Sequence, residues 1–134
     1  MQIIKLIGEH GSGKTMLARR LPHLFGSPLR APHHTISTAT LVQEMGMAMG
    51  GVLFLDEIEK FSQSVIHALC SAMACTARVN PRVPVLVVAG ETRTNRHLEA
   101  FAKLEAEIIV INCDALAPAA ISHFCGLVDA LATR

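Results

Sequence analysis

One stretch near the N-terminus has the residue types and the spacing that bind phosphate groups. Residues 8–15 read GEHGSGKT and fit the pattern GxxxxGK followed by Ser or Thr. The glycines let the backbone curl so that amide groups point at phosphate oxygens, and a helix beginning there adds its positive end. We expect Lys14 to reach the β- and γ-phosphates of a nucleotide and the Thr15 hydroxyl to help hold Mg²⁺. The predicted phosphate-binding residues are Gly8, Glu9, His10, Gly11, Ser12, Gly13, Lys14 and Thr15.

A second stretch ends in two adjacent carboxylates. Residues 51–57 read GVLFLDE, an apolar run that leads directly into Asp56 and Glu57. In a parallel sheet this end of a strand opens onto the same crevice as a phosphate-binding loop. Asp56 would then lie near Mg²⁺, which prefers carboxylate oxygens, and Glu57 would polarise a water for attack on the γ-phosphate. We interpret Glu59 and Lys60, which follow, as ordinary surface charge.

These two stretches need a scaffold in which strands and helices alternate. Continuous apolar runs suit strands that are buried on both faces of a parallel sheet. Four such runs occur, at Ile3–Ile7, Val52–Leu55, Val83–Val88 and Ile108–Ile111. Helical spacing of apolar residues occurs within residues 17–25, 35–49, 61–73, 98–104 and 121–131. The segment from Ser27 to His34 contains two prolines and predicts at most a short or edge strand. The alternation predicts an α/β domain with right-handed crossovers.

Length and composition limit the class of protein. A chain of 134 residues predicts one domain, and 51% hydrophobic residues exclude disorder. A net charge of +1 gives no electrostatic footprint for nucleic acid or an acidic membrane, and the lack of Trp and Tyr argues against a base-stacking surface. No CxxC spacing and no membrane-length apolar run occur, so we expect a soluble cytoplasmic protein with reduced cysteines.

Together these motifs resemble the P-loop module of AAA+ ATPases, and more closely the group of the magnesium chelatase I-subunit and its competence-associated bacterial relatives. The similarity lies in GEHGSGKTMLARRLP, in LRAPHHTIS from Leu29 to Ser37, and in GVLFLDEIEKFSQSVIHAL from Gly51 to Leu69. The resemblance implies a three-layer α/β/α sandwich with five parallel strands, and Mg²⁺-dependent ATP hydrolysis. It also implies rings in which an arginine from a neighbouring subunit completes each site.

The chain departs from the family pattern at several positions. The relatives carry a longer, glycine-rich insert between the His-His-Thr stretch and the acidic strand. Where the family has a water-orienting Asn after the fourth strand, this chain offers Thr92. Where the family has its trans-acting arginine, this chain has Lys103, with Arg93 and Arg96 as nearby alternatives.

The family also carries a C-terminal helical lid. In this chain the lid is predicted to be absent or reduced to one helix at residues 117–133, so that residues 1–134 form a single nucleotide-binding domain. We therefore expect weak turnover unless an oligomer or a partner completes the site.

His33 and His34 form the most particular part of the similar segment. Adjacent side chains in an extended segment point in opposite directions, so we expect the pair not to bind one metal ion. We interpret them as structural or interface residues, with coupling to a substrate as the alternative.

The predicted function is that of an AAA+-type ATPase whose hydrolysis is coupled to assembly or remodelling of a partner. Glu57, Lys14 and Thr92 are the predicted catalytic residues, Thr15 and Asp56 the predicted metal ligands, and ATP and Mg²⁺ the cofactors. The alternative is a nucleotide-dependent interaction module with little or no hydrolysis. A small P-loop kinase is a third hypothesis. The expected partners are ATP or ADP and a second copy or another protein, with no membrane, and nucleic acid enters by family analogy alone.

Overall fold

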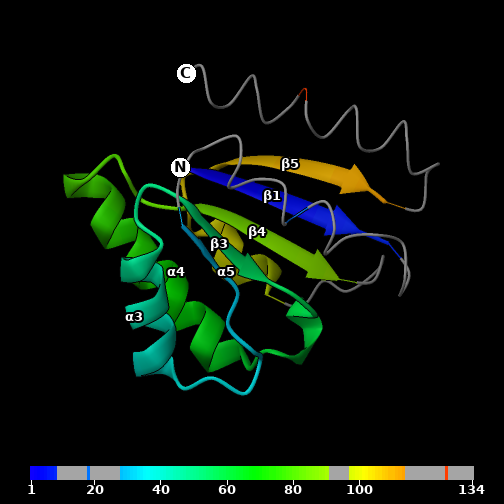
Figure 1. The fold of residues 1–134 in the computed structure, drawn as a ribbon, viewed down its shortest axis with the longest axis horizontal. Helices are drawn as coiled ribbons and strands as arrows, with labels where there is room; N and C mark the ends of the chain where they lie inside the picture. The colour runs from blue at the N-terminus through cyan, green and yellow to red at the C-terminus, as the bar shows by residue number, and fades with distance from the viewer. Residues whose placement is uncertain (9–17, 19–27, 91–96, 114–125, 127–134) are drawn as a thin grey trace.

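Five parallel strands form one sheet in the order β2-β3-β4-β1-β5. The computed structural model describes residues 1–8, 18, 28–90, 97–113 and 126 (Figure 1). The strands are β1 (Gln2–Ile7), β2 (Leu29–Arg30), β3 (Val52–Leu55), β4 (Val85–Gly90) and β5 (Glu107–Asn112). The predicted α/β fold with a five-stranded parallel sheet is therefore confirmed.

The central strands are buried on both faces, as the continuous apolar runs predicted. Every residue of β3 and β4 is buried. Alternate strand residues contribute to two separate core clusters, with Ile3, Leu53 and Leu86 in one and Ile4, Val52 and Val87 in the other.

Two differences from the predicted strands have local causes. β4 begins two residues later than predicted, because Pro84 lacks the N–H that a ladder position needs, and the strand starts at the next residue. β5 is an edge strand, and the side chains of Ile108 and Val110 are 43% and 55% exposed, so the prediction that this run is buried on both faces was wrong. The short β2 lies at the opposite edge, as its prolines predicted.

Three α-helices supply apolar side chains to the first core cluster and cover that face of the sheet (Figure 1). They are α3 (Thr38–Met47), α4 (Gln63–Val79) and α5 (Leu98–Ala102), and a short 3₁₀ helix, η1 (Ile58–Lys60), follows β3. Ser37 and Ser62 cap α3 and α4 by accepting hydrogen bonds from the backbone N–H groups of Thr40 and Val65. These caps explain why α3 begins after residue 35.

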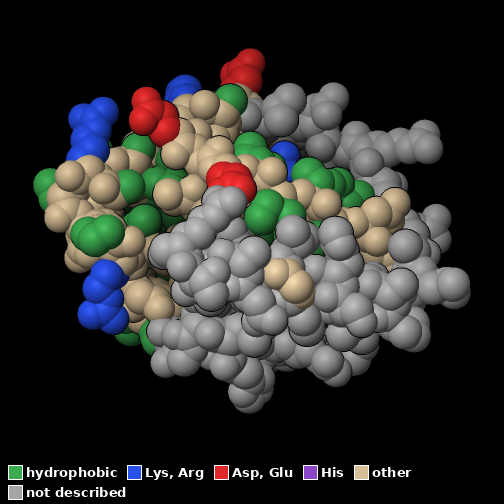
Figure 2. Space-filling view, turned by 90° about the horizontal axis from the view of Figure 1, so that it is seen from above, with side chains coloured by type: hydrophobic (Ala, Val, Ile, Leu, Met, Phe, Trp, Pro, Cys, Tyr) green, Lys and Arg blue, Asp and Glu red, His purple; other side chains and the backbone are tan. Residues whose placement is uncertain are grey.

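The predicted helices within residues 17–25 and 121–131, and the C-terminal helix at 117–133, lie outside the described residues. Within the described part of the chain, no helix is both long enough and apolar enough to cross a membrane. Among the described residues on the face shown in Figure 2, charged side chains of both signs occur, which agrees with the near-neutral net charge.

Candidate nucleotide-binding site

The carboxyl ends of three neighbouring strands bring together the two sequence motifs. In the ladder, Ile7 of β1 pairs with Gly90 of β4, and Leu55 of β3 pairs with Val88 of β4. β4 lies between β1 and β3, so the first residue of the phosphate-binding motif and the acidic pair leave the sheet at the same edge. The juxtaposition that the motifs predicted is therefore present at the level of the strands.

Gly8 is the one residue of the predicted phosphate-binding loop that the structure describes. Its backbone N–H donates a hydrogen bond to the carbonyl oxygen of Gly90, with a distance of 3.2 Å. This bond continues the β1–β4 ladder by one step and fixes the point where the loop begins. The remaining predicted loop residues, including Lys14 and Thr15, and the predicted catalytic Thr92 lie outside the described residues.

Asp56 and Glu57 lie directly after the fully buried strand β3, and both are half-buried. One carboxylate oxygen of Asp56, Oδ1, accepts a hydrogen bond of 2.9 Å from the backbone N–H of Glu57. Glu57 has a left-handed backbone, with φ 52° and ψ 53°, which is uncommon for a residue other than glycine. The chain therefore turns sharply at Glu57 and enters η1, so both carboxylates stay at the edge of the sheet.

Of the two charged residues of η1 that were predicted to be ordinary surface charge, Lys60 agrees with the prediction and Glu59 does not. Lys60 Nζ lies 3.1 Å from Glu57 Oε1 in an ion pair whose two side chains are both partly exposed to solvent. Glu59 behaves differently, because its Oε2 is buried and has no hydrogen-bond partner among the described residues. A Cβ on Gly90 would lie 2.7 Å from that oxygen, so Glu59 lies against the end of β4.

His97 is a buried polar residue beside this site that the sequence analysis did not single out. Its side chain is 5% exposed, and its Nε2 lies 3.1 Å from the carbonyl oxygen of Ile58 in η1. The contact joins residues 39 positions apart in the chain. Sequence spacing gave no signal for this contact.

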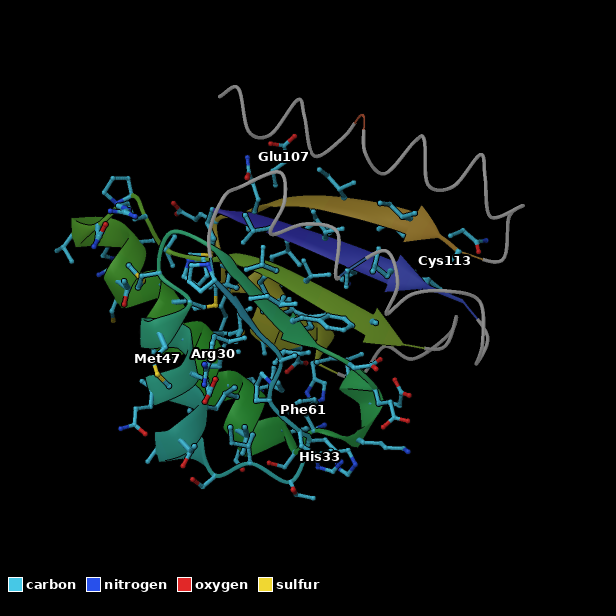
Figure 3. All side chains as sticks on the ribbon, in the orientation of Figure 1. Arg30, His33, Met47, Phe61, Glu107 and Cys113 are labelled. Atoms are coloured by element: carbon cyan, nitrogen blue, oxygen red, sulfur yellow. The ribbon has the colours of Figure 1, made fainter. Side chains whose placement is uncertain are left out.

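The arrangement of His33 and His34 contradicts the argument made from the sequence. The chain turns at residues 34–35, and the two rings lie side by side with centroids 4.0 Å apart, so they do not point in opposite directions. His34 also meets the edge of buried Phe61, which follows η1, with ring centroids 6.4 Å apart. Figure 3 shows the neighbouring His33 and Phe61 in the same region of the fold. No group of three possible metal ligands occurs among the described residues, and the contact with Phe61 favours a structural role.

The segment that contains the histidines is fastened to α3 by an ion pair. Arg30 donates from Nε and Nη2 to the two carboxylate oxygens of Glu44, at 2.6 and 2.9 Å. These hydrogen bonds hold the pKa of the Glu44 carboxyl below its ordinary value, and partial burial opposes that effect. Both residues line an open groove of about 510 Å³. The other lining residues are Leu29, Ala31, Pro32, His33, Thr35 and Ile36.

Lys103, the predicted substitute for the trans-acting arginine, does not lie near the acidic pair. Lys103 ends α5 and lines a cavity with Met1 and Arg78, at the amino-terminal end of β1. It therefore lies at the opposite end of the sheet from Gly8 and Asp56. The alternatives Arg93 and Arg96 are outside the described residues.

Comparisons with known proteins agree with this fold and these motifs. Residues 25–79 match the family model of magnesium chelatase, subunit ChlI. The competence protein ComM of Haemophilus influenzae is 33% identical over 99 aligned positions, which take in 47% of this chain and 19% of ComM. YifB of Escherichia coli K12, an uncharacterized protein, is 33% identical over 100 positions, with 48% of this chain and 20% of YifB covered. This chain thus spans about a fifth of the length of the curated relatives it matches.

The alignment with ComM also bears on the predicted shorter connection. The alignment has 99 positions but takes in only 47% of the 134 residues of this chain, so part of the aligned region of ComM has no counterpart here.

Among solved structures, a RuvB variant of Thermotoga maritima has the same fold. Its TM-score is 0.59 and its sequence identity is 20%, and the match covers 82% of this chain and 37% of that one. The family match over residues 25–79, the two relatives and the shared fold together show that this chain is similar to the ChlI- and ComM-like P-loop domains of AAA+ ATPases.

Proposed function

We propose that this domain binds ATP together with Mg²⁺ and hydrolyses it, and that hydrolysis is coupled to the assembly or remodelling of a partner. One observation carries the proposal: Gly8 and the Asp56–Glu57 pair leave neighbouring parallel strands at the same edge of the sheet. Phosphate binding by the loop and carboxylate chemistry at the strand end are useful to a nucleotide hydrolase only when they act on the same phosphates.

The proposed roles of the binding residues follow from their chemistry. The backbone of residues 8–15 would cradle the phosphates, and Lys14 would reach the β- and γ-phosphates. Asp56 and Thr15 would hold Mg²⁺, which takes hard oxygen ligands, and Mg²⁺ when bound supplies positive charge against the phosphate oxygens. The hydrogen bond from the Glu57 N–H supports the role of Asp56, because it orients the carboxylate.

Glu57 is the proposed base that orients and polarises the attacking water, and Thr92 is proposed to help position that water. The ion pair with Lys60 competes with this role, because it occupies one Glu57 oxygen. An exposed pair of this kind contributes only about 0–1 kcal/mol. Bound nucleotide can therefore draw Glu57 away from Lys60 at little cost, and the pair does not prevent hydrolysis.

The same ion pair favours a second candidate function. While Lys60 occupies Glu57 Oε1, that oxygen is not available to the attacking water, so hydrolysis by the isolated domain would be slow until bound nucleotide displaces Lys60. The domain would then act chiefly as a module whose assembly with itself or another protein depends on bound nucleotide. The name of one relative, competence protein ComM, links that larger protein to competence, and a nucleic-acid partner for this chain is proposed by family analogy alone.

The test is phosphate release from ATP in the presence of Mg²⁺ by the parent and by Glu57→Gln. We expect the substitution to reduce turnover about 100-fold or more while ATP binding persists, because the amide cannot accept a proton. Glu105→Gln makes the same chemical change on an exposed residue and should leave turnover unchanged. Equal rates in the parent and Glu57→Gln would refute the proposed hydrolysis.

Measurements across protein concentration separate the two candidates. A specific activity that rises with concentration indicates a site shared between subunits, as a neighbour's residue would require. Mass in solution, measured with and without ATP and Mg²⁺, tests nucleotide-dependent assembly. A mass that does not change, together with no partner binding, would count against the interaction module.

A further inference from the structure

Two residues have left-handed backbones without being glycine in the described part of the chain. They are Glu57, with φ 52°, and His97, with φ 69°. A backbone in this region persists only where surrounding contacts hold it, and such residues concentrate at functional sites. Glu57 precedes η1 and His97 precedes α5, yet the two regions meet in space.

The meeting point is the hydrogen bond between the His97 ring and η1. Nε2 lies 3.1 Å from the carbonyl oxygen of Ile58, the residue that follows Glu57. A carbonyl oxygen only accepts hydrogen bonds, so Nε2 carries the proton and donates. The ring is 5% exposed and meets the edge of the Phe101 ring, with centroids 6.4 Å apart, so it has little freedom to leave this position.

The end of β4 also packs against η1. A Cβ built on Gly90 would lie 2.7 Å from Glu59 Oε2 and 2.8 Å from Ile58 Cγ2. Only a glycine therefore allows η1 to approach the strand this closely. Gly90 and His97 therefore both lie against η1.

η1 needs such external support because it is too short to hold itself. It spans three residues, and its own backbone hydrogen bonds are those from Lys60 N to Glu57 O, at 2.8 Å, and from Phe61 N to Ile58 O, at 3.2 Å. Short 3₁₀ segments have poor hydrogen-bond geometry and depend on their surroundings. The orientation of Glu57 at the start of η1 therefore depends on what packs against that helix.

We infer that His97 is a positioning residue: by donating to the Ile58 carbonyl it holds η1, and through η1 it sets the direction of the Glu57 carboxylate. The inference rests on the proposed function, in which Glu57 acts on water.

Three variants separate positioning from general stability. His97→Asn keeps a residue that tolerates the left-handed backbone but is too short to reach Ile58. His97→Gln places an amide nitrogen at about the reach of Nε2 and should restore the bond. Phe101→Leu removes buried packing next to the ring while leaving the His97 donor in place, and it serves as the control for lost stability.

We expect His97→Asn to lower kcat about 10- to 100-fold, the range expected for a displaced catalytic group, with the Kd for ATP within about threefold of the parent. His97→Gln should recover most of kcat, and Phe101→Leu should lower Tm with little effect on kcat. In the double variant with Glu57→Gln, His97→Asn should cause no further loss, because His97 acts through Glu57. Additive losses, or a kcat for His97→Asn equal to that of Phe101→Leu, would overturn the inference.

A measurement without hydrolysis distinguishes failure of this inference from failure of the proposed function. Amide hydrogen exchange at Lys60 and Phe61 reports directly on η1. Exchange at both should be faster in His97→Asn than in Phe101→Leu or His97→Gln. If the parent shows no hydrolysis that depends on Glu57, the proposed function fails while the exchange result still decides whether His97 holds η1. Unchanged exchange in His97→Asn refutes the positioning role.

Discussion

Substitution of Gly90 by alanine tests whether the close approach of η1 to β4 shapes the site. Gly90 ends β4, pairs with Ile7, and accepts the hydrogen bond from the Gly8 N–H that begins the phosphate-binding loop. The new methyl group would lie 2.7 Å from Glu59 Oε2 and 2.8 Å from Ile58 Cγ2. Ordinary van der Waals contact begins at 3.4 Å, so the neighbouring atoms must move by about 0.6 Å or more.

The two neighbours differ in how easily they can move. The Glu59 carboxylate is the end of a flexible side chain and can rotate away, but Ile58 is 6% exposed and packed in the core, so its shift carries the η1 backbone with it. Overpacking of this kind destabilises by about 1–3 kcal/mol. Removing glycine from a strand offsets about 0.5–1 kcal/mol of that, because the unfolded chain loses freedom. The net loss is about 0–2.5 kcal/mol, or about 0–10 °C in Tm for a domain of this size.

The assay combines thermal and urea unfolding with ATP turnover. Gly46→Ala is the matched control, since a Cβ there meets nothing within 4 Å and Gly46 lies in α3, where alanine should stabilise by about 0.5–1 kcal/mol. We expect Gly90→Ala to lower turnover about 10- to 100-fold, far more than its modest loss of stability explains, because η1 carries Glu57 with it. A Gly90→Ala protein as stable and as active as Gly46→Ala would refute the reasoning.

Two further predictions concern titration and thiol chemistry. The lowered pKa of Glu44 beside Arg30 means that their ion pair stabilises the fold fully above the ordinary carboxyl pKa of 4.5, and that this contribution is lost as the pH falls through the lowered value. Glu44→Gln should therefore flatten the acid limb of stability measured by urea unfolding between pH 7 and pH 3, and an unchanged limb would contradict the assigned pair. Burial raises the pKa of the Cys70 thiol to about 12, whereas Cys75 is exposed, so a thiol reagent at pH 8 should modify Cys75 in the native state and Cys70 only on unfolding, as mass spectrometry of peptides can show.

The fold was predictable because its signals are local. Continuous apolar runs mark strands that are buried on both faces, and Pro84 marks where β4 can begin. The same reasoning failed for Ile108 and Val110, because an apolar run in an edge strand looks the same as one in a central strand. Position in the sheet is a property of the topology and not of the run itself.

The surroundings of the acidic pair were not predictable for a related reason. The contact from His97 to Ile58 joins residues 39 apart, and the close approach of Gly90 to Glu59 joins residues from two different elements. Neither leaves a periodic pattern or a motif in the sequence. The stacked rings of His33 and His34 were mispredicted because the argument assumed an extended segment where the chain turns.

The acidic pair lies at the junction between the well-packed elements β3 and α4. β3 is buried along its whole length, and α4 is capped by Ser62 and packs through Ile66, Leu69, Cys70 and Met73. Between them, η1 has two backbone hydrogen bonds of its own, one from His97 and one exposed ion pair. A short 3₁₀ helix depends on its surroundings, so the direction of Glu57 is set by what packs against η1. In the proposed function, bound nucleotide would therefore redirect Glu57 only by changing the contacts of η1 with His97 and Gly90, which makes these contacts the place where the cycle can be tuned.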